Sequence, residues 1–175
     1  AMLVACCDHG KEASSTAVAI TAASTGNALH SAVAAGFLAM GPKHGCAVDS
    51  TMRLLAVEES PHAVVERALA AGERLPGFGH KVYTEQDPRT VALLARATTL
   101  GYHGQYVRRA LDLEAALLAM KGRTIPLNVD GCLAALALEL RFLPETGNAL
   151  FMLGRLPGLV AHAVEASRLK TYVRQ

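Results

Sequence analysis

Three residues that could exchange protons stand in short, glycine-bearing sequence contexts. His44 lies in a Gly-Pro-Lys-His-Gly turn, His80 lies in a Gly-Phe-Gly-His turn, and Asp130 lies in Asn-Val-Asp-Gly just before an apolar stretch. Imidazole groups donate and accept hydrogen bonds near neutral pH, and glycine lets the backbone approach a ligand closely. The sequence therefore suggests a general acid/base set made of two histidines and one carboxylate.

Each of these residues also has a structural interpretation when taken alone. A histidine can cap a turn or a helix end, and aspartate is a frequent N-cap. Two arginines raise the same question. Arg89 falls in the first turn of a predicted helix, where a cation opposes the helix dipole, so contact with a ligand explains it better. Arg155 falls inside an apolar helix and, once buried, needs an anion, which could be Asp8, Glu165 or a substrate.

Helix signals recur along the chain with little strand signal between them, which predicts an all-α fold. Alanine and leucine dominate, whereas aromatic residues supply only 5% of the sequence. Proline-based helix starts are visible at Ser60-Pro61, Asp87-Pro88 and Leu143-Pro144, and the first two place a capping side chain before the proline. The predicted helices cover residues 11–23, 26–40, 46–58, 61–72, 87–100, 105–120, 129–141 and 145–168.

The turn around His80 belongs to a longer motif. The stretch from Pro76 to Tyr83, followed by Asp87-Pro88-Arg89, resembles the signature of the citrate synthase and citryl-CoA lyase superfamily. Asn128-Val129-Asp130 resembles the catalytic carboxylate segment of that family, and the turn at His44 resembles its first catalytic histidine. The resemblance runs in the family's order along the whole chain, from Asp-His near the start to the Gly-Arg of the last predicted helix.

The resemblance implies enolate chemistry on a coenzyme A thioester. Asp130 would remove the methyl proton of acetyl-CoA, and His44, as neutral imidazole, would stabilise the developing enolate with a hydrogen bond. His80 would protonate the carbonyl oxygen of a 2-oxo acid as the carbon attacks, and cleavage of citryl-CoA would run these steps backwards. The thioester is a substrate in this scheme, with no covalently bound cofactor and no metal.

The resemblance also implies how a small di- or tricarboxylate is held. Arg89 and Arg155 match the two family arginines that come from the same subunit, and His9 matches a substrate-binding histidine. Planar guanidinium groups suit bidentate contacts with carboxylates. Lys43 and Lys81 flank the histidines and could face coenzyme A phosphates, although a solvated lysine is the commoner meaning. No residue is assigned to the coenzyme on this basis.

Two sequence details favour the citryl-CoA lyase branch, which includes the domain at the end of ATP-citrate lyase. They are Asp8-His9-Gly10 and the stretch from Leu127 to Gly131. We therefore expect a carbon–carbon lyase that interconverts citryl-CoA, or a related 3-hydroxy-acyl-CoA, with acetyl-CoA and oxaloacetate or a related 2-oxo acid. Two alternatives stay open: a citrate or methylcitrate synthase-type condensing enzyme, and a non-catalytic or partner-dependent subunit.

By the same resemblance, the chain is an N-terminally truncated citrate synthase-like fold of two parts. Large-domain helices, within residues 1–43 and 144–175, flank a small coenzyme-A-binding part at residues 44–143. Family members carry further helices before the Asp-His segment, so we expect a homodimer or a partner polypeptide to bury the faces that those helices cover. A family arginine also reaches in from the tail of the other subunit. Arg174 matches it poorly, so the source of that arginine stays open.

The composition limits the classes of partner and the cellular compartments that we expect for this chain. The 17 Lys and Arg against 15 Asp and Glu form no charge run, so no nucleic-acid partner is predicted. Residues 13–40 are apolar but rich in small side chains, which favours close helix packing in water over a membrane span. The cysteines lack zinc-ligand spacing and follow no signal-peptide pattern, which predicts reduced thiols in a cytoplasmic protein. Cys46 and Cys132 are expected to be small buried hydrophobes rather than nucleophiles.

Overall fold

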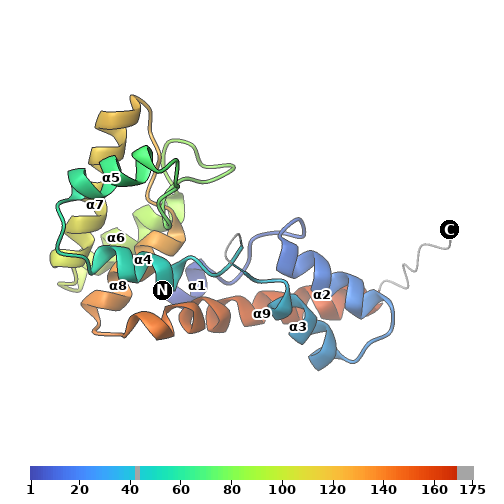
Figure 1. Cartoon of the computed structure of the whole chain (residues 1–175). Helices are drawn as coiled ribbons and strands as arrows, with labels where there is room; N and C mark the ends of the chain where they lie inside the picture. Colours follow the sequence, from blue (N-terminus) through green and yellow to red (C-terminus); the bar gives the residue numbers. More distant parts are fainter. Residues whose placement is uncertain (42–43, 169–175) are drawn as a thin grey trace. The chain divides into compact units, whose positions relative to one another are not determined.

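The computed structural model describes residues 1–41 and 44–168, and over these ranges the chain is helical without a named strand (Figure 1). This confirms the all-α prediction. Lys43, considered above for coenzyme A phosphates, and Arg174, considered above as the tail arginine, lie outside the described residues. The chain divides into two units, one of residue 1 with residues 47–148 and one of residues 2–46 with 149–175. We call them the insertion unit and the terminal unit.

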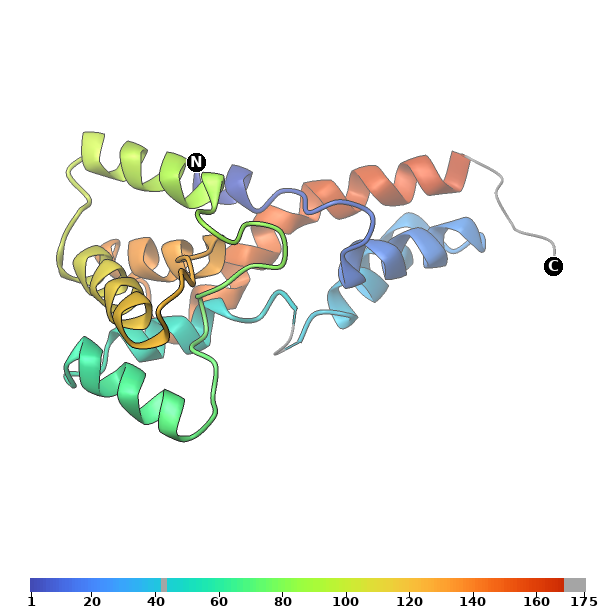
Figure 2. The same ribbon diagram turned by 90° about the horizontal axis from the view of Figure 1, so that it is seen from above.

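The insertion unit is a cluster of helices around one central helix. Its elements are α4 (Val48–Leu55), α5 (Pro61–Ala70), α6 (Pro88–Thr99), α7 (Gln105–Lys121), α8 (Val129–Glu139) and the 3-10 turn η1 (Pro144–Thr146). Helix α8 contacts α4, α6 and α7 (Figure 2). Residues 131–138 of α8 are all buried, as expected for a helix that is apolar on every face. Asp130 is only half-buried and lies in the first turn of that helix.

The helix starts of the insertion unit follow the predicted proline signals. The hydroxyl of Ser60 accepts a hydrogen bond from the amide of Ala63 at 3.3 Å, and the carboxylate of Asp87 accepts one from the amide of Arg89 at 3.0 Å. Both side chains are the N-caps of helices that open with proline, which confirms the two predicted caps. The third proline, Pro144, begins the 3-10 turn, and the long last helix starts later.

The terminal unit is built from α1 (Met2–Ala5), α2 (Ser14–Ser24), α3 (Leu29–Leu38) and α9 (Gly147–Arg168), whose first two residues belong to the insertion unit. Helices α2 and α3 lie beside each other and beside the second half of α9 (Figures 1 and 2). Small side chains make this close approach possible, which confirms the packing predicted for residues 13–40. The buried cluster comprises Ala19, Ala23, Ala32, Val33, Leu159, Ala163 and Ala166.

One helical stretch, Pro144–Arg168, is long and apolar enough by length and composition to cross a membrane. The core helix of a soluble protein passes the same test. This stretch carries the buried Arg155 and supplies three side chains to the apolar cluster with α2 and α3. These features are those of a core helix. The helix also continues through Pro157, so this proline does not end it.

Candidate active site

The ring of His80 is oriented by its own turn. Its Nδ1 atom accepts hydrogen bonds from the backbone amides of Val82 and Tyr83, both at 3.1 Å. Backbone amides can only donate, so Nδ1 is an acceptor and the proton of the neutral ring sits on Nε2. The ring of Tyr83 stacks on the imidazole, with centroids 4.7 Å apart and an interplanar angle of 25°. The turn therefore directs an Nε2–H donor away from its own backbone.

Arg89 is held in place by a fully buried carboxylate. Asp87 Oδ1 accepts from the amide and the Nε of Arg89 at 3.0 and 2.9 Å, and Oδ2 accepts from Arg89 Nη2 at 2.7 Å. Oδ2 also accepts from the amide of Val129, the first residue of α8, at 3.1 Å. Burial by itself would raise the pKa of Asp87, but the contacts with Arg89 outweigh it and hold that pKa below its ordinary value. Asp87 thus joins the starts of α6 and α8.

Two hydrogen-bond donors meet at this point of the insertion unit. Arg89 Nη2 lies 3.3 Å from His80 Nε2. Burial lowers the pKa of His80, and the positive charge of Arg89 lowers it further against the smaller opposing effect of Asp87. The imidazole is therefore stabilised in its neutral form. Adjacent N–H donors from a guanidinium and a neutral imidazole suit one electron-rich oxygen of a ligand, such as that of a carboxylate or a carbonyl.

Asp130 lies in the first turn of α8 but does not cap that helix. The N-cap of α8 is Asn128, whose Oδ1 accepts from the amide of Gly131 at 3.1 Å, so the N-cap interpretation of Asp130 is wrong. Burial disfavours the charge of Arg89, yet Asp87 chiefly, and Asp130 to a lesser extent, raise the pKa of that guanidinium. The influence of Asp130 places its carboxylate within electrostatic reach of Arg89. Within the insertion unit, His80 thus contacts Arg89, and Asp130 lies close enough to influence the charge of Arg89.

In the terminal unit, the start of α2 faces His44. The buried Ser15 donates its amide N–H to His44 Nε2 at 3.3 Å, and its hydroxyl oxygen lies 2.9 Å from the same atom. Since the amide is a donor, Nε2 is the acceptor and the proton of the neutral ring sits on Nδ1. This arrangement fits the predicted neutral donor. Ser15 itself was not predicted; the pair of serines at the start of a helix was the available signal.

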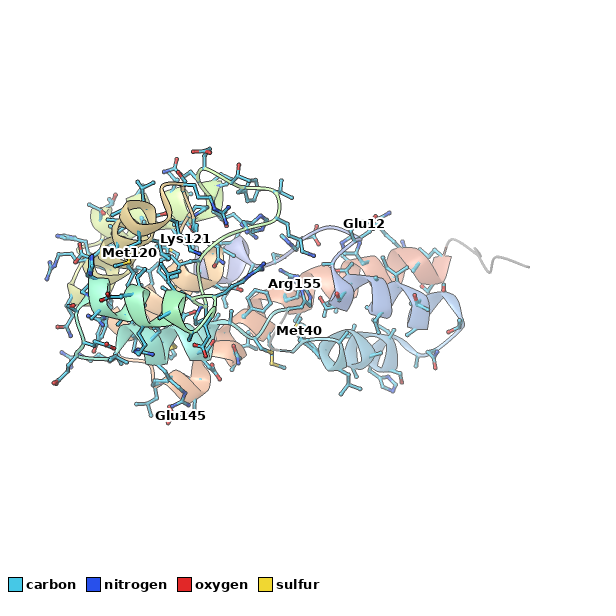
Figure 3. The ribbon with its side chains drawn as sticks, turned by 45° about the horizontal axis from the view of Figure 1, so that its top comes forward. Glu12, Met40, Met120, Lys121, Glu145 and Arg155 are labelled. Carbon is cyan, nitrogen blue, oxygen red and sulfur yellow. The ribbon has the colours of Figure 1, made fainter. Side chains whose placement is uncertain are left out.

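Arg155 is buried in the middle of α9, where Figure 3 labels it. Its Nε donates to the carbonyl oxygen of Cys6 at 2.7 Å, and its guanidinium carbon lies 4.9 Å from the ring centroid of Phe151. The segment after α1 approaches α9 so closely that a Cβ atom at Gly158 would collide with the carbonyl oxygen of Cys7. These contacts fix the stem of the arginine between a short segment and an aromatic ring.

The segment after Cys7 carries the predicted substrate histidine. His9 is exposed, and its neighbour Asp8 accepts a hydrogen bond from Nε2 of His162 at 3.0 Å. Burial would raise the pKa of Asp8, but His162 and two backbone amides lower it overall. Asp8, one of the anions considered for Arg155, is therefore bound to α9 through His162. His9, His44 and Arg155 all lie in the terminal unit, whereas the other three predicted site residues lie in the insertion unit.

The side chain of Cys132 is fully buried. Burial raises the pKa of Cys132 to about 12, which confirms its interpretation as a small buried hydrophobe. Cys46 is half-buried. Within residues 1–41 and 44–168, no three or more His, Cys, Asp or Glu side chains are grouped so that they could hold a metal ion.

Sequence comparison identifies the family to which this arrangement belongs. The family model described as "Citrate synthase, C-terminal domain" matches residues 1–174. The chain belongs to the citrate synthase family. Its fold is similar to that of citryl-CoA lyase from Hydrogenobacter thermophilus, with a TM-score of 0.92 and 36% identity over 99% of this chain and 71% of that one. It is also similar to ATP citrate lyase from Methanothrix soehngenii, solved with citrate and coenzyme A, with a TM-score of 0.87 and 29% identity.

Curated relatives of the family are considerably longer than this chain. It is 34% identical to "Probable ATP-citrate synthase" of Dictyostelium discoideum over 93% of this chain and 29% of that protein. It is 38% identical to "Putative citrate synthase 2" of Mycobacterium bovis over 98% of this chain and 48% of that protein. The ATP citrate lyase structure is covered over 31% of its chain. The chain thus spans less than half the length of these relatives.

Proposed function

We propose that this chain supplies the catalytic region of a citryl-CoA lyase, which interconverts citryl-CoA with acetyl-CoA and oxaloacetate. The observation that carries the proposal is the pair of donors formed by His80 Nε2 and Arg89 Nη2, with Asp130 in electrostatic reach. Such a pair suits the oxygen functions of a hydroxy- or oxo-carboxylate. Similarity to a citryl-CoA lyase over 71% of its length supports the choice of reaction.

In the condensing direction, the proposed reaction begins on the methyl group of acetyl-CoA. Asp130 removes a methyl proton from acetyl-CoA, and the electron pair moves to the thioester oxygen, which accepts a hydrogen bond from Nδ1 of His44. The enol carbon then attacks the carbonyl carbon of oxaloacetate, and His80 gives its Nε2 proton to the carbonyl oxygen. Preorganised donors of this kind stabilise developing oxyanions more strongly in a desolvated site than in water. The product is citryl-CoA, with the thioester intact.

The surroundings of His80 suit this proton transfer. After Nε2 has given up its proton, the ring is an imidazolate anion. The two backbone amides that bind Nδ1 and the guanidinium of Arg89 stabilise that form. Cleavage is the reverse: the hydroxyl proton of citryl-CoA returns to Nε2, the carbon–carbon bond breaks, and the enol of acetyl-CoA recovers the proton from Asp130. Arg89, Arg155 and His9 are proposed to hold the carboxylates.

A pair of assays tests the proposal. The purified, folded chain is incubated with citryl-CoA, and separately with acetyl-CoA plus oxaloacetate, and the acyl-CoA species are followed by mass spectrometry. Asp130→Asn preserves shape but removes the base, so we expect it to abolish turnover. Asp112→Asn, a surface carboxylate of α7, is the matched control and should keep wild-type rates. A folded wild-type chain that turns over neither substrate set contradicts the assignment.

A synthase-type condensation is the second candidate, because the Mycobacterium bovis relative at 38% identity is named a citrate synthase. The two functions differ in the fate of the citryl thioester. A synthase hydrolyses it and releases free coenzyme A with citrate, whereas a lyase leaves it intact. Accumulation of free coenzyme A in step with citrate would favour the synthase.

We propose a homodimer, or a complex with a partner polypeptide, because the ATP citrate lyase structure contains the matching region as 31% of a longer chain. The cytoplasm remains the expected compartment. Tight binding of coenzyme A or citrate without turnover, or turnover only after a second polypeptide is added, would favour a partner-dependent subunit. Activity of the chain alone would exclude that reading.

A further inference from the structure

The turn that carries His80 is fastened to the segment that leads into Asp130. The amide of Gly79 donates to the carbonyl oxygen of Pro126 at 2.7 Å, and the amide of Asn128 donates to the carbonyl oxygen of Gly77 at 3.0 Å. Phe78 and Leu127 form an isolated antiparallel bridge between them. Two segments far apart in the sequence are thus paired over three residues each.

Two glycines allow the paired backbones to touch. Gly77 has a φ of 83°, and a Cβ atom built on it would lie 2.8 Å from Cα of Gly131. In return, a Cβ atom on Gly131 would collide with the carbonyl oxygen of Gly77. A residue with a side chain at either position would push the two segments apart. The contact lies three residues before His80 and one residue after Asp130.

The side chain of Asn128 closes this junction at both of its ends. Its Oδ1 accepts from the amide of Gly131 at 3.1 Å and so caps α8, while its Nδ2 donates to the carbonyl oxygen of Gly79 at 2.9 Å. The two contacts also settle the orientation of the side-chain amide group. Its oxygen must face the N–H of Gly131, and its NH2 group must face the carbonyl oxygen of Gly79. One side chain therefore touches both the residue before His80 and the residue after Asp130.

We infer that Asn128 is a positioning residue, which sets the separation between the His80 imidazole and the Asp130 carboxylate by holding the Gly79 carbonyl and the first turn of α8 at once. The inference rests on the proposed function, in which Asp130 exchanges a proton with the acetyl carbon and His80 exchanges one with the oxygen on the carbon that this acetyl carbon attacks. Displacement by about 1 Å in such a site can cost about 100-fold in rate. An N-cap alone requires only an acceptor, so the donor half of this side chain has a separate role.

The substitution Asn128→Ser separates the two halves. Serine is as good an N-cap as asparagine, but its side chain is too short to reach Gly79 as well. We expect kcat for citryl-CoA cleavage to fall by about tenfold to 100-fold, with KM changed by less than about threefold. In NMR hydrogen exchange, the amide of Gly79 should exchange at least about tenfold faster as the pairing loosens.

The matched control is Ser60→Ala, which removes the N-cap of α5 but touches neither segment. It should lower the thermal midpoint by about 2–4 °C and leave both kcat and the Gly79 exchange rate unchanged. The inference is overturned if Asn128→Ser keeps wild-type kcat, if the Gly79 exchange rate does not change, or if Ser60→Ala loses kcat equally. Failure of the wild type to cleave citryl-CoA would instead count against the proposed function, while the exchange rates still decide whether Asn128 fastens the turn.

Discussion

Loss of the buried carboxylate of Asp87 should lower the free energy of unfolding by an amount that follows from its contacts. Asp87 accepts four hydrogen bonds, three from Arg89 and one from the amide of Val129, and is fully buried. Asparagine at this position has one oxygen. If that oxygen keeps the contacts of Oδ1, the new NH2 group faces two other donors, Arg89 Nη2 and the amide of Val129. Asp87→Asn therefore leaves donors without acceptors and a half-buried cation without its counter-charge.

The expected cost is about 3 to 5 kcal/mol of unfolding free energy, the range for breaking one side of a buried ion pair. For a chain of this length, that corresponds to a fall in the thermal midpoint of about 6 to 20 °C. Circular dichroism at 222 nm during thermal and urea denaturation measures both quantities. Glu59→Gln is the matched control, because Glu59 forms an exposed ion pair with Arg67 and such pairs contribute little.

The effect of Asp87→Asn should also depend on pH. Because the folded pKa of Asp87 lies below the unfolded value of about 3.9, the unfolded chain binds more protons between those two values. The stabilisation is therefore complete above about pH 4 and is lost as the pH falls through the folded pKa. The gap between wild type and variant should narrow over that window. A gap below about 1 kcal/mol at pH 7, or a gap that stays the same at acid pH, would contradict the stabilising role of the Asp87 carboxylate.

Three further predictions concern individual side chains. In 15N NMR of the imidazoles, His44 should be the Nδ1–H tautomer, and an Nε2–H tautomer would contradict this expectation. Ser15→Ala keeps the amide donor but removes the hydroxyl, so it should lower turnover by about tenfold with little change in stability. His80 should titrate below about pH 6.5, so its contribution to stability is lost as the pH falls from that value towards the folded pKa. Arg89→Gln should raise the pKa of His80, and an unchanged titration would count against the role of Arg89. Cys132 should resist alkylation by iodoacetamide at pH 8 until urea unfolds the chain, and rapid modification of the native protein would show the thiol to be accessible.

The elements of the fold were predictable because local signals mark them. Helices α2 to α9 all have predicted counterparts whose ends agree within a few residues, since prolines and capping side chains mark several of the starts. Short α1 was not predicted, because four residues carry no periodicity to detect. Two prolines did not mark the boundaries of α9. Pro144 opens a 3-10 turn before the helix starts, and the helix continues through Pro157.

The partners of the candidate residues could not be predicted from the sequence. The capping role of Asp87 is local and was expected, but its contact with Val129 joins residues 42 positions apart. The hydrogen bond from Ser15 to His44 and the pairing of Gly79 with Pro126 likewise depend on tertiary packing. Glycine and serine are common for many reasons, so their types alone did not single them out. The roles of the six site residues remain predictions.

The most direct test of the lyase assignment is cleavage of citryl-CoA in D2O, with the mass of the acetyl-CoA product measured by mass spectrometry. If Asp130 delivers a solvent-derived proton to the enol carbon, the acetyl group formed by the wild-type chain carries one deuterium. Asp130→Asn should form none of this product, and Asp112→Asn should match the wild type. Recovery of intact citryl-CoA from the folded wild-type chain, or its conversion to citrate and coenzyme A without acetyl-CoA, would contradict the lyase assignment.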